Sequence, residues 1–228
     1  MLDDLGIEAE YTHAGAEHKV PIHFSALTTA EADKYGRIVF LSRDPRDTVV
    51  SAFHQARWRD RNRYRDGISE FVRDPIFGIQ KIVHFNRLWS ELAAQRTDIL
   101  STTYEELHAG TLAVLSRVIS HFGEVRSQAE MQSAIAHNEF AKVREREMAG
   151  DFDKKYRGRL GLTEPGEPNS LKCRRGEIGS YLDELSSADI AYCNDTIRIS
   201  RSNRSPPPRG DSLPVNHSGS LPHPSARR

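Results

Sequence analysis

The sequence predicts an α/β fold in which short parallel strands alternate with amphipathic helices. Two stretches, 37–42 and 98–104, are short and largely apolar or β-branched, as buried strands are. Three longer stretches repeat apolar residues at the spacing of one helix face, and they alternate with the two strands along the chain. This order is typical of a parallel sheet flanked by helices.

The first strand and the helix after it are the most sharply defined part of this pattern. The stretch RIVFLS, residues 37–42, predicts the strand. The following helix is expected to begin at Pro45, because proline suits the first helical turn, and to end near Arg57.

Two further helices and one strand are expected downstream. A helix over 75–94 has an apolar face made of Ile79, Ile82, Val83, Phe85, Trp89 and Leu92. The strand over 98–104 follows it. The next helix has an apolar face made of Leu112, Leu115, Val118, Ile119 and Phe122.

The chain divides into one globular unit, residues 1–199, and a tail, residues 200–228. A chain of 228 residues with 37% hydrophobic residues suffices for one domain. The tail contains six of the eleven prolines and few apolar residues. Because such a composition buries too little apolar surface to offset its ordering entropy, we expect the tail to be disordered.

Charge and cysteine content exclude several classes of protein. The 32 basic and 32 acidic side chains cancel, so no overall field favours nucleic acid or an anionic membrane. The acidic first residues lack the pattern of a signal peptide, and no apolar stretch approaches a membrane span. Cys173 and Cys193 are too few for a disulfide framework, and we expect reduced thiols. A cytoplasmic location is therefore expected.

The corner between strand 37–42 and the helix at Pro45 is a candidate anion site. A helix that begins just after a strand points its free N–H groups at the carboxyl edge of the sheet. Arg43 could grip a phosphate there, and the hydroxyl of Ser51 lies two helical turns further along. A solvated capping network of arginine and aspartate side chains is the alternative interpretation.

The segment SRDPRDTVVSAF resembles the 3′-phosphate-binding motif of sulfotransferases that use 3′-phosphoadenosine 5′-phosphosulfate, PAPS. In that family an arginine follows a strand, a Pro-Arg-Asp or Pro-Lys-Asp turn comes next, and a serine stands eight residues after the arginine. Arg43 and Ser51 fit this spacing. The resemblance implies a P-loop NTPase-like parallel sheet and PAPS as the sulfuryl donor.

Three further segments match the family in the expected order. TTYEEL, with Tyr104, and HNEFAKVRE, with Phe140, resemble segments whose aromatic rings lie near the adenine. CRRGEIGSYLDELS resembles the family's Arg-Lys-Gly-x-x-Gly-Asp-Trp signature, which assigns the phosphate-binding loop to Arg174, Arg175 and Gly176. Ser180 and Tyr181 stand where the family often has Asp-Trp, so the docking of this loop is in question.

The resemblance also implies a histidine base that accepts the proton of the acceptor hydroxyl. YTHAG places His13 in the corresponding region, although Tyr11 replaces the lysine of the family's Lys-Thr-His. A structural role is the alternative for His13. His13, His18 and His23 recur every five residues, a spacing that suits no metal site, and no metal is expected.

One element of the family is missing from the sequence. The glycine-rich Lys-x-Gly-Thr-Thr-Trp turn, which wraps the 5′-phosphosulfate in the family, occurs nowhere in the 228 residues. The resemblance therefore implies a partial sulfotransferase domain, incomplete at its N-terminus and inactive as it stands. The alternatives are a non-catalytic nucleotide-binding or interaction remnant, and a gene fragment without a folded role.

The acceptor is expected to carry a hydroxyl group. The segment HQARWRDRNRYRD contains Arg57, Arg59, Arg61, Arg63 and Arg65, with Trp58 and Tyr64 between them. In the family, segments after this helix often approach the acceptor, so an anionic glycan is one candidate. A solvated surface balanced by aspartates is the other interpretation. The neutral net charge and the lack of a recognisable module argue against nucleic acid.

Overall fold

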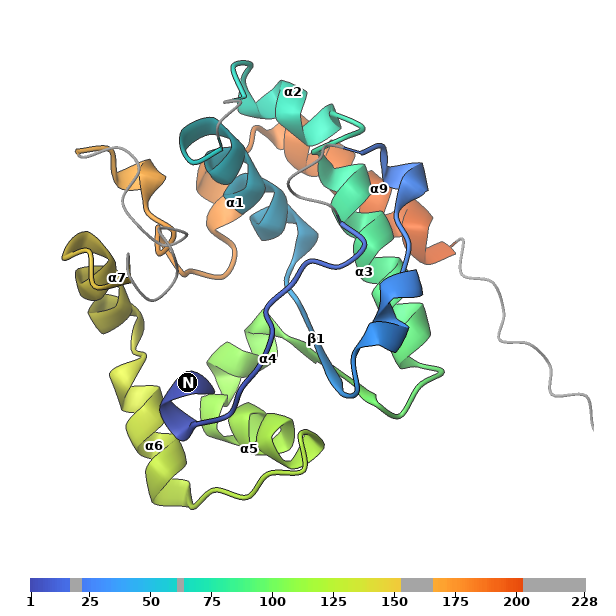
Figure 1. Ribbon diagram of the computed structural model, residues 1–228. Helices are drawn as coiled ribbons and strands as arrows, with labels where there is room; N and C mark the ends of the chain where they lie inside the picture. The colour runs from blue at the N-terminus through green and yellow to red at the C-terminus, as the bar shows by residue number, and fades with distance from the viewer. Residues whose placement is uncertain (17–21, 61–63, 153–165, 203–228) are drawn as a thin grey trace, which may run out of the picture.

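Two parallel strands lie at the centre of the fold (Figure 1). The computed structural model describes all residues except 17–21, 61–63, 153–165 and 203–228. Strands β1 (Ile38–Ser42) and β2 (Ile99–Thr103) pair in parallel, with Ser42 opposite Thr103. Because the two strands end side by side, the residues that follow them start from neighbouring positions at one edge of the sheet.

Helices make up most of the rest of the described chain. The α-helices are α1 (Pro45–Trp58), α2 (Ile68–Arg73), α3 (Ile79–Ala93), α4 (Tyr104–Ala109), α5 (Thr111–His121), α6 (Gln128–His137), α7 (Phe140–Met148) and α9 (Ser187–Ser202). The short 3-10 helices are η1 (Asp3–Leu5), η2 (Phe24–Ala26), η3 (Ala30–Lys34), η4 (Pro168–Ser170) and η5 (Ser180–Asp183). Figure 1 shows α1, α2, α3 and α9 on one side of β1, and α4, α5 and α6 on the other.

The predicted α/β class is confirmed, since both predicted strands pair in parallel and helices flank them. The helix expected from residue 75 begins at Ile79 instead, because Asp74 turns the preceding chain. Its carboxylate accepts hydrogen bonds from the backbone N–H groups of Ile76 and Phe77, at 2.7 and 3.0 Å. A local carboxylate–backbone turn of this kind competes with helix formation.

Tyr104 was expected to end the second strand but begins helix α4. Thr103 is the N-cap residue, and its hydroxyl accepts a hydrogen bond of 3.0 Å from the backbone N–H of Glu106. Threonine is a good cap because its side-chain oxygen satisfies an amide that the first helical turn leaves free. The cap therefore ends β2 one residue earlier than predicted.

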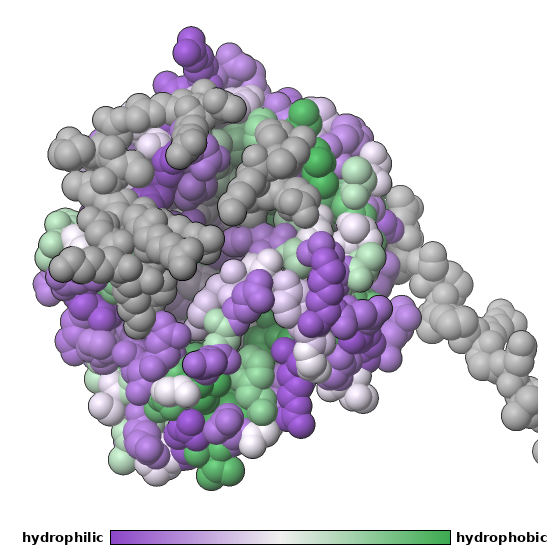
Figure 2. Space-filling view, in the orientation of Figure 1, coloured by the Kyte–Doolittle hydropathy of each residue, from purple (hydrophilic) through white to green (hydrophobic). Residues whose placement is uncertain are grey.

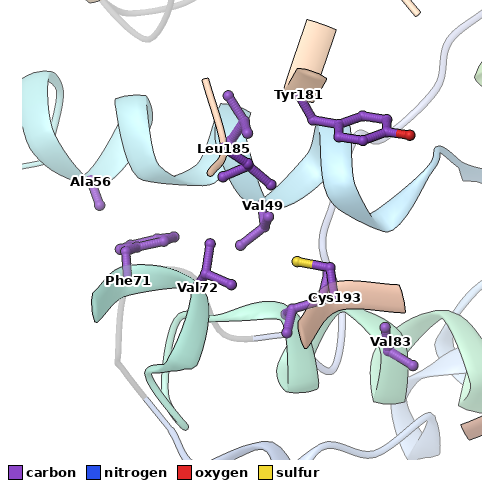
Figure 3. Close-up of a cluster of buried hydrophobic side chains, with 10 residues drawn as sticks. Val49, Ala56, Phe71, Val72, Val83, Tyr181, Leu185 and Cys193 are labelled. Carbon is purple, nitrogen blue, oxygen red and sulfur yellow. The ribbon is translucent and has the colours of Figure 1, made fainter. Parts of the chain in front are cut away.

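The largest core cluster lies between α1, α2, α3 and α9 (Figure 3). Val49, Phe71, Val72 and Cys193 are each at most 1% exposed. Figure 3 shows Val49 of α1 pointing toward α2, whose Phe71 and Val72 point back. Burying a side chain of this size contributes about 1.5–3 kcal/mol, so this cluster holds α1 firmly beside the sheet.

A second cluster covers the sheet itself. Phe40 of β1 stacks on Trp89 of α3, with ring centres 5.9 Å apart, and Ile99 of β2 joins them. The Trp89 indole N–H donates to the carbonyl oxygen of Ala14, which ties the N-terminal segment to α3. A third cluster packs Leu5 against α5 and α6.

Helix α9 extends to Ser202, past the boundary predicted at residue 199. The rest of the predicted tail, 203–228, lies outside the described residues. Hydrophilic residues predominate on the face of the molecule shown in Figure 2. Within the described ranges, no helix combines the length and the apolar character that crossing a membrane requires.

Candidate functional site

Arg43 and Tyr104, the residues that follow β1 and β2, meet at the carboxyl edge of the sheet. The guanidinium carbon of Arg43 lies 4.5 Å from the centre of the Tyr104 ring, a cation–π contact. Arg43 also donates a hydrogen bond of 2.5 Å to the carbonyl oxygen of Glu177. The strand register thus brings a cation, an aromatic ring and the loop 171–179 together.

Helix α1 begins at the same edge. Asp44 is its N-cap residue and accepts a hydrogen bond of 2.8 Å from the backbone N–H of Arg46. The positive end of the α1 dipole therefore lies next to Arg43. Ser51 lies two turns further along α1 and is exposed to solvent.

Gly176 is the residue of the loop that Tyr104 and Phe140 both contact. The hydroxyl of Tyr104 donates to its carbonyl oxygen at 2.9 Å. Its φ is +69°, a conformation that glycine adopts at little cost. A Cβ at this position would lie 2.5 Å from a ring carbon of Phe140, so the ring of Phe140 packs directly on the glycine backbone.

Phe140 and Tyr104 therefore lie on two sides of Gly176, as first residues of α7 and α4. Phe140 remains 41% exposed, so part of its ring faces solvent. Burial raises the pKa of Tyr104 and outweighs the opposing effect of Arg43, so the phenol keeps its proton at neutral pH.

Arg174 and Arg175 pair with carboxylates that follow the loop. Arg174 contacts Glu184 at 2.6 Å, and Arg175 contacts Asp183 at 2.8 Å. Glu184 also binds His54 of α1 at 2.5 Å. Burial alone would raise the pKa of Glu184, but the hydrogen bonds from His54 and Arg174 outweigh it and lower the pKa. These contacts thus join Arg174 to α1 through Glu184.

Asp47 was not among the predicted site residues, yet it anchors the far end of the loop. Its side chain is buried, and it accepts hydrogen bonds from the backbone N–H groups of Gly179 and Tyr181, at 2.8 and 3.1 Å. Ser180 donates a third at 3.2 Å. The sequence motif could have indicated this residue, because Asp47 is the aspartate of the Pro-Arg-Asp turn, but only the fold shows which backbone groups it binds.

His13 lies in the N-terminal segment, near the start of the same loop. Desolvation by the surrounding chain lowers the pKa of His13, and the positive charge of Lys172 lowers it further. The His13 side chain still has exposed surface. Lys172 in turn donates a hydrogen bond of 3.1 Å to Gln55, one turn beyond Ser51 on α1. Lys172 therefore connects the two: its charge acts on His13, and its side chain contacts α1 near Ser51.

Two arginines of the candidate acceptor segment donate hydrogen bonds to backbone carbonyl oxygens of the chain. Arg57 donates to the carbonyl oxygens of Arg65 and Asp66, at 2.8 and 3.2 Å. Arg59 has a side chain that is 5% exposed and donates to the carbonyl oxygen of Ser170 at 2.5 Å. The predicted residues 61 and 63 lie outside the described part of the chain.

Comparison with known proteins identifies related sequences and folds. The model of the sulfotransferase domain family matches residues 17–204. Human sulfotransferase 2B1 is 25% identical over 125 residues, which cover 54% of this chain and 34% of the human protein. The chain thus matches about a third of the length of that relative.

Solved structures agree on the fold. Retinol dehydratase in a complex with retinol and PAP superposes with a TM-score of 0.62 and 20% identity, covering 81% of this chain and 54% of that chain. A mouse sulfotransferase complexed with PAP gives a TM-score of 0.57 and 16% identity, covering 80% and 64%. Because the family model matches most of the sequence, this chain belongs to the sulfotransferase domain family.

Proposed function

We propose that this chain binds the 3′-phosphoadenosine part of PAPS, as the donor half of a site for sulfuryl transfer to a hydroxyl acceptor. The observation that carries the proposal is the contact network at Gly176: Tyr104 and Phe140 contact Gly176 itself, and Arg43 contacts Tyr104 and the next residue of the loop. These residues come from four separate parts of the sequence. PAP, which accompanies the two related structures, is adenosine 3′,5′-bisphosphate, the product that PAPS leaves after transfer.

Arg43 and the start of α1 are the proposed cradle of the 3′-phosphate. The Nε of Arg43 is buried and has no hydrogen-bond partner among the described residues. An unsatisfied buried donor is costly, so an acceptor that reaches this atom when the Arg43 side chain moves would be stabilised. A phosphate oxygen would satisfy it, and the α1 dipole and the exposed Ser51 hydroxyl would add favourable contacts.

The adenine is proposed to lie against the exposed part of Phe140, beside Tyr104. Aromatic side chains that stack on a nucleobase contribute about 1–3 kcal/mol per base. Phe140 is the first residue of α7 and stays partly exposed while its ring rests on Gly176. An ordinary core aromatic would be covered on all sides, so the exposure of Phe140 favours a ligand role.

Transfer itself requires an acceptor hydroxyl that attacks the sulfur. The new S–O bond forms as the bond between sulfur and the 5′-phosphate oxygen breaks, and a base takes the hydroxyl proton. His13 is the proposed base because its segment resembles that of the family's histidine base, and its lowered pKa leaves the imidazole neutral at pH 7. The products are a sulfate ester and adenosine 3′,5′-bisphosphate.

The sequence lacks the Lys-x-Gly-Thr-Thr turn that the family places around the 5′-phosphosulfate. We therefore propose that these 228 residues bind the nucleotide but turn it over poorly. The acceptor class remains a hydroxyl compound, and the internal hydrogen bonds of Arg57 and Arg59 give no support to an anionic glycan.

Isothermal titration calorimetry with adenosine 3′,5′-bisphosphate tests the proposal. We expect Arg43→Ala to weaken binding at least tenfold, since it removes a charge-assisted bond to the phosphate. Lys34→Ala is the control, because the Lys34 side chain is 66% exposed and forms its ion pair with Glu31 within the short helix η3. Equal affinities of the wild type and Arg43→Ala would contradict the proposed phosphate site.

A further inference from the structure

Helix α7, labelled in Figure 1, contacts the phosphate-binding loop through side chains from its first turn to its last. Three of its residues, Phe140, Arg144 and Glu147, are spaced i, i+4, i+7 and so share one face of the helix. They contact Gly176, Arg174 and the pair Lys172–Cys173, respectively. The loop therefore runs antiparallel to α7, with one contact for each turn of the helix.

Glu147 is the most deeply buried of these three residues. It is 1% exposed, and its two carboxylate oxygens accept hydrogen bonds from the backbone N–H groups of Lys172 and Cys173, at 2.5 and 2.8 Å. Arg59 at the end of α1 lies 3.8 Å away and partly balances the charge. A buried carboxylate is costly unless its oxygens are satisfied, and here the loop backbone satisfies them.

Arg144 holds the next residue of the loop. Its guanidinium donates a hydrogen bond of 2.8 Å to the carbonyl oxygen of Arg174. Phe140 then packs on Gly176 at the end of the same face. These contacts restrain the backbone just before, and at both ends of, the residues 174–176 that the family resemblance assigns to the phosphate.

We propose that α7 holds residues 172–176 of the loop 171–179 in a fixed conformation, and that Arg144 and Glu147 are positioning residues for binding of the 3′-phosphate. Neither side chain needs to touch the nucleotide. They act by holding the backbone of Arg174–Gly176 in one shape before the ligand arrives, which lowers the ordering cost of binding. The inference rests on the proposed function, because it assumes that this loop receives the phosphate.

The test compares Glu147→Gln with Glu145→Gln, a matched change at an exposed position of the same helix. In Glu147→Gln, a side-chain NH₂ replaces one of the two accepting oxygens and faces a backbone N–H. Affinities for adenosine 3′,5′-bisphosphate and adenosine 5′-monophosphate are measured for both variants. We expect Glu147→Gln to weaken bisphosphate binding about tenfold and monophosphate binding less, whereas Glu145→Gln changes neither.

Hydrogen exchange gives a readout that is independent of the ligand. The amides of Lys172 and Cys173 should exchange faster in Glu147→Gln than in the wild type, and at the wild-type rate in Glu145→Gln. If the wild type does not bind the bisphosphate, the proposed function fails, while the exchange rates still decide whether α7 holds the loop. Unchanged exchange of these amides in a folded Glu147→Gln would overturn the proposal that α7 holds the loop.

Arg144 supplies a second pair of variants in case Glu147→Gln does not fold. Arg144→Met removes the donor to the carbonyl oxygen of Arg174, while Arg144→Lys keeps one donor of similar reach. We expect Arg144→Met to lower the ratio of bisphosphate to monophosphate affinity and Arg144→Lys to restore part of it. An unchanged ratio in Arg144→Met would contradict a positioning role for this arginine.

Discussion

The hydroxyl of Tyr104 donates a hydrogen bond of 2.9 Å to the carbonyl oxygen of Gly176, 72 positions further along the chain. Strand β2, which ends beside β1, positions Tyr104. Hydrogen bonds from the backbone of its loop to Glu147 and Asp47 position Gly176. The hydrogen bond therefore joins the sheet edge to the loop, and a substitution at Gly176 should disturb the packing of both.

Gly176→Ala is expected to destabilise the protein more than Gly179→Ala. Both glycines have positive φ, +69° and +82°, which costs about 1 kcal/mol for alanine. Only at Gly176 would the new Cβ also meet Phe140, at 2.5 Å, whereas nothing lies within 4 Å at Gly179. Thermal unfolding of the two variants measures the difference. Equal losses of stability would show that Phe140 does not pack on Gly176 in solution.

Asp47→Asn is expected to lower the free energy of unfolding by about 3 kcal/mol. The amide leaves a donor facing one of the backbone N–H groups of Gly179 and Tyr181, and it removes the negative charge 3.4 Å from Arg43. Asp44→Asn is the comparison, because asparagine caps a helix about as well as aspartate does, and the ion pair with Arg46 that it weakens is partly exposed to solvent. Urea denaturation should separate the two variants, and similar midpoints would refute the anchoring role of Asp47.

Stability should fall in acid partly through Asp189. Burial alone would raise the pKa of Asp189, but hydrogen bonds from Ser186, Arg73 and Ser69 outweigh it and lower the pKa to about 2. Because the unfolded chain binds this proton more readily, the stabilisation is complete above about pH 5 and is lost as pH falls toward 2.

The measurement compares the wild type with Asp189→Asn between pH 6 and pH 2. The difference in free energy of unfolding should shrink by about 2 kcal/mol over this range. Asp4, whose pKa is also about 2, titrates in both proteins and so cancels from the difference. A difference that stays constant with pH would contradict the lowered pKa.

Sulfuryl transfer by the 228-residue chain is expected to be at least 10²-fold slower than by a family member whose sequence carries the Lys-x-Gly-Thr-Thr turn. Losing a single preorganised donor at developing charge costs about 10²–10³ in rate, and this sequence lacks the whole turn. The assay uses radiolabelled PAPS and a panel of hydroxyl acceptors. Comparable turnover would show that other residues of this chain supply the donors.

Several elements escaped prediction for a common reason. Helices α2 and α4 are six residues each, too short to repeat an apolar pattern. Helix α7 is mostly polar, and its buried face contains Arg144 and Glu147, which only their partners in the loop explain. A polar residue that faces another part of the chain has the same sequence signal as one that faces water.

The sequence by itself determined the strands β1 and β2 and the helices α1, α3 and α5, because local apolar patterns and the proline at the start of α1 encode them. Arg43, Ser51, Tyr104, Phe140 and Gly176 were identified by their resemblance to motifs of the family. Only the tertiary structure decided that Tyr104 begins a helix, that Arg174 pairs with Glu184, and that Asp47 and Glu147 hold the two ends of one loop. The physical reason is that buried carboxylates are tolerated only where distant backbone amides satisfy them, and those amides become neighbours only after the chain folds.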